Sequence, residues 1–153
     1  MRKLAILLPI ILLAGLFQNT GVFNIFGVKP NLLLAVLIPA IFFLDQILAV
    51  AAALAIALLV SDFRAGFAGE SVVLALLILI VPVFGRRLPW NPFINNMVLV
   101  GAATIVFYLL TGPAYIVSSP LGVLGEIFYN SLFAAIFYNL FNSCLKMNSM
   151  LKI

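Results

Sequence analysis

Few side chains in this sequence can do chemistry, and the acids among them number four: Asp45, Asp62, Glu70 and Glu126. There is no histidine, and the single cysteine is Cys144. This removes histidine-based acid–base catalysis, disulfides within the chain and nearly every His/Cys metal site. No glycine-rich phosphate loop occurs, no Ser or Cys stands beside a plausible base, and no two carboxylates share a helix at metal-ligand spacing. The sequence predicts a protein that is not an enzyme and binds no cofactor.

Glu126 and Asn130 form the most distinctive polar pair, because they lie one helical turn apart within a strongly aromatic apolar run. A carboxylate inside hydrocarbon costs a few kcal/mol on insertion scales, so one that stays there usually has a partner or a function. Two interpretations are open for Glu126. It stands near the start of its expected helix, where it reaches water and favours the positive end of the helix dipole, or it meets the basic group of a partner.

Most of the chain is apolar: 66% of its residues are apolar and 8% are charged. Helices formed by the apolar runs must therefore position the few polar residues. A soluble domain is closer to about 45–50% apolar and about 25% charged, whereas lipid accepts apolar side chains on the outside of a protein. The runs cover residues 4–17, 32–44, 47–60, 72–84, 97–110 and 121–141. We therefore expect one all-α integral membrane domain over residues 1–153, with about six transmembrane helices.

Residues 31–61 are long for one transmembrane helix and short for two, given the roughly 20 residues that a helix needs to cross a bilayer. The positive-inside rule favours two helices. Six spans with an internal N-terminus place Lys29 and Arg64 outside, and the inside then holds Arg2, Lys3, Arg86, Arg87, Lys146 and Lys152. If residues 31–61 formed one helix, the chain would cross five times, and three bases would lie inside against five outside. We therefore expect both termini in the cytoplasm, with connectors 18–30, 61–71 and 111–120 on the outer side of the membrane.

The basic residues are dispersed along the chain and flank the apolar runs, as topology signals do. They form no stripe, so the formal net charge of +4 does not indicate a phosphate-binding surface. We expect contact with the lipid bilayer and no nucleic-acid partner.

Small residues in the third run provide one candidate helix interface, because Ala49, Ala53 and Ala57 recur every four residues. In lipid, this spacing lets two backbones approach closely, so that dispersion and weak hydrogen bonds hold the helices together. The close contact is either packing within the same chain or packing against a partner's helix, and the spacing allows both.

The order of these features resembles the MreD family of bacterial rod shape-determining proteins over nearly the whole chain. Residues 28–34, Val-Lys-Pro-Asn-Leu-Leu-Leu, stand where that family has a Pro-Asp-Leu-Leu-type motif, with Pro30 kept and Asn31 in place of the usual Asp. Asp62 looks like the acidic residue after the family's third segment, although the glycines before it are Ala or Leu here. Residues 125–130, Gly-Glu-Ile-Phe-Tyr-Asn, resemble the start of the family's final helix.

The resemblance implies a non-catalytic membrane subunit of the cell-elongation complex, which supports peptidoglycan synthesis and cell-shape control. In that family the protein holds MreC, a scaffold with one membrane helix, and through it works with the MreB filament, the RodA glycosyltransferase and its penicillin-binding transpeptidase. Helix packing is then the recognition mechanism. The candidate partner-binding residues are Pro30, Asn31, Ala49, Ala53, Ala57, Asp62, Glu126 and Asn130.

The fold that the resemblance implies is similar to the six-helix substrate-binding subunits of energy-coupling-factor transporters. This supplies an alternative, a vitamin or small-molecule binding subunit of such a transporter. Its pocket would open outward near residues 111–120 and 61–71. A pocket of this kind needs several convergent polar groups, for which Asn95, Asn96, Asn130 and Glu126 are the candidates.

Overall fold

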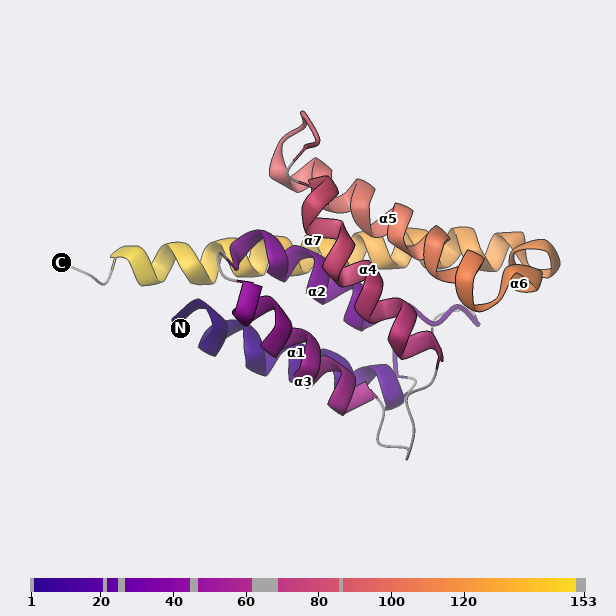
Figure 1. The fold of residues 1–153 in the computed structure, drawn as a ribbon, viewed down its shortest axis with the longest axis horizontal. Coiled ribbons are helices and arrows are strands. Elements are labelled where there is room, and N and C mark those ends of the chain that lie inside the picture. Colours follow the sequence, from indigo (N-terminus) through magenta and orange to yellow (C-terminus); the bar gives the residue numbers. More distant parts are fainter. Residues whose placement is uncertain are drawn as a thin grey trace.

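A computed structural model describes residues 2–20, 22–24, 27–44, 47–61, 69–85 and 87–150 of the chain. Its helices are α1 (Arg2–Thr20), α2 (Leu32–Phe43), α3 (Ile47–Ser61), α4 (Gly69–Gly85), α5 (Pro92–Thr111), α6 (Pro113–Ser118) and α7 (Pro120–Met150). No strand occurs in these ranges, so the all-α prediction is confirmed (Figure 1).

Every predicted apolar run lies in a helix of its own, apart from Leu44, which caps the end of α2. Residues 31–61 form two helices, α2 and α3, and not one long helix. Two features differ from the sequence prediction. The connector after α5 contains the six-residue helix α6, and the last helix continues to Met150, well beyond the predicted end at residue 141.

The central element of the fold is α2, a helix of 12 residues that is apolar all round. Residues 32–41 are all buried, because α2 packs against α1, α3, α4, α5 and α7. Figure 1 shows α2 between the α1–α3 pair and the α5–α7 pair. A helix without a polar face is stable when neighbours cover it on every side, and this arrangement supplies such a cover.

The outer surface of the bundle is rich in large apolar side chains. Leu13 of α1, Phe84 of α4, Leu109 of α5 and Phe128 of α7 are each more than half exposed. An exposed surface of this composition suits lipid, which accepts apolar groups that water does not.

Two helices of the described chain, Pro92–Thr111 and Pro120–Leu145, are long and apolar enough to cross a membrane. They contain 20 and 26 residues, whereas the apolar helices Ala5–Gln18, Leu32–Phe43 and Gly69–Gly85 contain 17 residues or fewer. The two long helices and the apolar surface indicate association with a membrane.

Candidate functional site

The start of α2 is the point at which several predicted residues meet. Asn31 is the N-cap of α2, and its Oδ1 atom accepts a hydrogen bond from the backbone N–H of Leu34 at 3.1 Å. Its carbonyl oxygen accepts from the N–H of Ala35 at 3.0 Å, which closes the first turn. An Asn cap of this kind stabilises a helix by about 0.5–2 kcal/mol. Pro30, directly before it, is buried.

Two other helices complete the capping of α2. The backbone N–H of Leu32 donates to Oε1 of Gln18 in α1 at 2.6 Å, and the N–H of Asn31 donates to Oδ1 of Asn130 in α7 at 2.7 Å. The first N–H groups of a helix have no partner within it, and a buried unpaired N–H costs about 1–3 kcal/mol. Gln18 and Asn130 therefore satisfy these groups and fix α1 and α7 to the start of the central helix.

Asn130 also connects α7 to α5. Its Nδ2 group donates to Oγ1 of Thr104 at 3.0 Å, and the Thr104 hydroxyl donates to the carbonyl of Val100 at 2.9 Å. Both side chains are buried, with Asn130 0% and Thr104 1% exposed. The amide of Asn130 thus uses its oxygen on α2 and its nitrogen on α5, which makes it the central polar contact among three helices.

Glu126 lies one helical turn before Asn130, and Tyr108 lies one turn after Thr104. The Tyr108 hydroxyl donates a hydrogen bond to Oε2 of Glu126. The Glu126 side chain is 7% exposed, and α7 begins six residues earlier at Pro120. Glu126 therefore lies in the second turn of α7 and is covered by α5, so its access to water is through the cavity that it lines.

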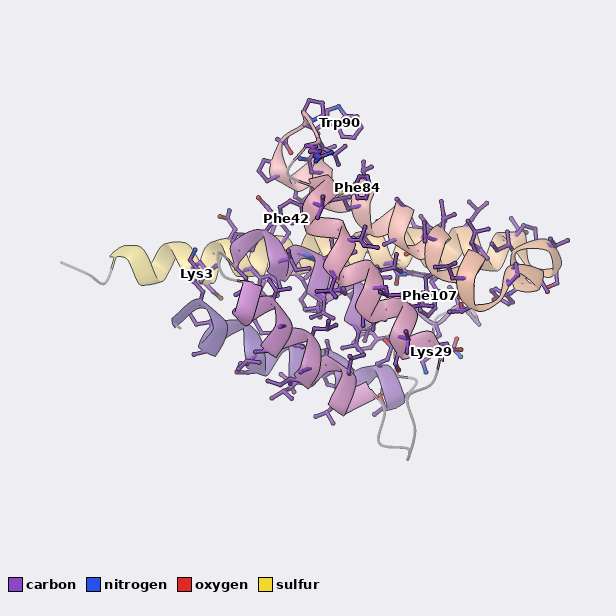
Figure 2. The ribbon with its side chains drawn as sticks, in the orientation of Figure 1. Lys3, Lys29, Phe42, Phe84, Trp90 and Phe107 are labelled. Atoms are coloured by element: carbon purple, nitrogen blue, oxygen red, sulfur yellow. The ribbon has the colours of Figure 1, made fainter. Side chains whose placement is uncertain are left out.

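A cavity of about 440 Å³ opens beside this polar cluster. Its lining includes Lys29, Asn31, Glu70, Tyr108, Tyr115 and Glu126. The rings of Tyr108 and Tyr115 are stacked, with centroids 5.3 Å apart and planes inclined by 26°. Phe107 also lines the cavity, and Figure 2 shows Phe107 and Lys29 on the right of the view, away from Trp90 at the top.

The position of the cavity matches that expected for a pocket of the binding-subunit alternative, near residues 61–71 and 111–120. Glu70 comes from the first of these connectors, and Thr111, Gly112 and Tyr115 come from the second. Of the four polar candidates named for that pocket, Glu126 lines the cavity. Two of the others are buried elsewhere, in contact with carbonyl groups: Asn95 donates to Leu88 and Asn96 to Ala134, each at 3.3 Å.

Comparison of the chain with models of protein families, with curated proteins and with solved structures finds no match.

Gly125, directly before Glu126, lies where the segment before α2 closely approaches α7. A Cβ atom at Gly125 would lie 3.2 Å from Cγ2 of Val28, closer than ordinary van der Waals contact. The absence of a side chain lets the segment before α2 lie directly against α7. This close approach brings Asn31 within hydrogen-bonding distance of Asn130.

The remaining predicted residues are separate from this cluster. Ala53 and Ala57 are 2% and 0% exposed and belong to the core of the chain itself, which is the first of the two alternatives for the alanine spacing. The side chain of Ala49 and the whole of Asp62 lie outside the part of the chain that the structure describes. Within that part, no group of three His, Cys, Asp or Glu side chains could hold a metal ion.

Three members of the site, Gln18, Thr104 and Tyr108, were not among the predicted residues. Thr104, Tyr108 and Thr111 follow a spacing of four and three residues, which puts them on one face of α5. This polar stripe within an apolar run was a signal for the site. Gln18 lacks such a signal, because its contact with Leu32 depends on how α1 packs against α2.

Proposed function

We propose that this chain is a non-catalytic subunit of the cell-elongation complex of a bacterium, of the MreD type, and that it spans the inner membrane six times. The observation that carries the proposal is that the two segments with the clearest family resemblance, residues 28–34 and 125–130, meet in space. The Asn31 N–H donates to the side-chain oxygen of Asn130, and Val28 packs closely against Gly125. Two family-like segments about a hundred residues apart in the chain thus act as one structural unit.

The arrangement of the connectors supports six crossings. Lys29, Glu70 and Tyr115 come from the three connectors expected outside, and all three line one cavity. Trp90, from a connector expected inside, projects at the top of the view, away from Lys29 at the lower right (Figure 2). Alternate connectors at opposite ends are the pattern of a chain that crosses and returns each time.

Short helices are compatible with this topology. At about 1.5 Å per residue, α2 measures about 18 Å, less than the roughly 30 Å of a hydrocarbon core. Protein covers α2 on all sides, so the ends of α2 need not reach lipid headgroups themselves. Local bilayer thinning is a further way to accommodate α3 and α4.

The partner in this proposal is a scaffold of the MreC type with one membrane helix, recognised by packing on the apolar surface of the bundle. The test is co-purification of the two full-length proteins in mild detergent, together with an unrelated single-span protein as control. Selective recovery of the scaffold supports the proposal. Equal recovery of the scaffold and the control would count against it.

The cavity favours a second candidate function, a small-molecule binding membrane subunit. Its volume of about 440 Å³ falls within the about 300–1,000 Å³ that is usual for ligand pockets. Mass spectrometry of the protein purified from its host is the test. A stoichiometric vitamin or similar compound would support this function, and cells of normal shape after depletion would then favour it over the first.

A further inference from the structure

Glu126 is a buried carboxylate whose contact is a neutral hydroxyl. It is 7% exposed and accepts a hydrogen bond from Tyr108. Among the residues that the structure describes, no lysine or arginine forms an ion pair with it. Carboxylates within membrane segments generally face a cavity or a basic partner, because an uncompensated buried charge costs several kcal/mol. Glu126 faces a cavity, and the described part of the chain gives it no basic partner.

The charges around the cavity favour a cation. Glu70, at the start of α4, adds a second carboxylate to the lining, and it is exposed. Among the described residues that line the cavity, Lys29 is the one base, and it is also exposed. Among the described lining residues, the buried ionisable group is therefore an acid, Glu126, and the two acids outnumber the one base.

The aromatic wall of the cavity favours the same class of ligand. Tyr108, which bonds to Glu126, stacks on Tyr115 at a centroid distance of 5.3 Å. The face of an aromatic ring attracts a cation that lies within about 6 Å of its centroid. Stacking covers one face of each ring, so the free faces of this pair, together with the carboxylate, are the groups that can bind an organic ammonium ion.

From these observations we infer that the cavity binds a primary ammonium group, with Glu126 as its counter-ion and Tyr108 and Tyr115 as its aromatic wall. A cavity of about 440 Å³ is much larger than an ammonium ion, so the ligand carries a further group. Two sources share this chemistry, a small soluble amine and the headgroup of an aminophospholipid. The inference does not depend on a role in cell elongation, since it concerns what the purified protein binds.

A matched series of soluble probes tests the charge requirement. Calorimetric titration of the full-length protein in detergent would use phenethylamine, the neutral 2-phenylethanol and the anionic phenylacetate. The amine is expected to bind at least about tenfold more tightly than the alcohol, because it alone compensates the buried carboxylate. Equal affinities for amine and alcohol would overturn the inference without any variant.

Variants assign the preference to Glu126. Glu126→Gln keeps an acceptor for the Tyr108 hydroxyl and removes the charge, so the preference for amine over alcohol should disappear. Asp45→Asn, the same change in a connector expected on the inner side, should leave the preference unchanged. Lys29→Gln removes a competing positive charge and should raise the preference for amine over alcohol. An undiminished preference in a folded Glu126→Gln protein would contradict the inference.

A lipid experiment separates the two sources. The protein is reconstituted in nanodiscs with equal amounts of phosphatidylethanolamine and phosphatidylglycerol, and retained lipid is counted by native mass spectrometry after detergent extraction. Selective retention of phosphatidylethanolamine that phenethylamine displaces identifies the lipid headgroup. Amine binding without selective lipid retention identifies a soluble amine. Absence of both would overturn the inference, and neither result bears on binding of a scaffold.

Discussion

The backbone N–H of Asn31 donates a hydrogen bond to the side-chain oxygen of Asn130, 2.7 Å away and 99 residues later in the chain. This bond joins the start of the central helix α2 to the first half of the last helix α7. Because Asn130 also donates to Thr104 of α5, one side chain holds three helices at a fixed position. The cavity and Glu126 lie directly beside this contact.

Replacement of Asn130 should weaken the fold through these two bonds. Asn130→Leu has nearly the same size but leaves the Asn31 N–H without its acceptor and removes the hydrogen bond that the Thr104 oxygen accepts, so a loss of about 2–4 kcal/mol is expected. Asn130→Asp keeps the acceptor for Asn31 and should lose less. Thermal unfolding in detergent measures the effect, with Asn139→Leu on the exposed face of α7 as control. Equal stability of the Asn130→Leu and Asn139→Leu proteins would show that the contact is not needed.

The close approach of Val28 to Gly125 predicts a compensating pair of substitutions. Gly125→Leu would force its side chain against Val28 and should destabilise the protein by about 1–3 kcal/mol, the usual range for overpacking. Val28→Ala removes the opposing methyl groups and should restore part of the loss. Unfolding temperatures of the two single variants and the double variant give the coupling. If the effects of the two substitutions simply add, the side chain at position 125 does not clash with Val28.

The alanine spacing predicts a difference between neighbouring positions of α3. Ala53→Leu inserts a larger side chain into the core and should destabilise the isolated protein by about 1–3 kcal/mol, whereas Ala51, which is exposed, should tolerate Leu. The measurement is thermal unfolding of each variant without any partner. A normal Ala53→Leu protein that fails to bind the scaffold would instead assign this face to the partner.

Six crossings predict which positions an impermeant thiol reagent can reach in intact cells. A cysteine at Gly66, in an outer connector, should be labelled from outside. A cysteine at Asn91 and the native Cys144 should react after the cytoplasmic side is opened. Labelling of positions 66 and 91 from the same side would rule out this topology.

The helices of this fold were predictable because each apolar run is long enough to form a helix. The six-residue α6 was not, since a helix of under two turns has no periodic pattern to detect. Glu126 and Asn130 could be selected from residue type and spacing, and Asn31 from the family resemblance. Their environment could not, because the burial of Glu126 depends on Tyr108, 18 residues earlier, and the capping of α2 depends on Gln18 and Asn130 from other helices.

Cell width after depletion tests the proposed function most directly. In a rod-shaped host, loss of the protein should give rounded, widening cells, because the elongation complex then lacks its membrane subunit. Re-expression of the wild-type chain at normal membrane levels should restore the width, and Asn130→Leu should restore it in proportion to the folded protein present. Cells that remain normal rods after complete depletion, while uptake of a vitamin is lost, would contradict the account.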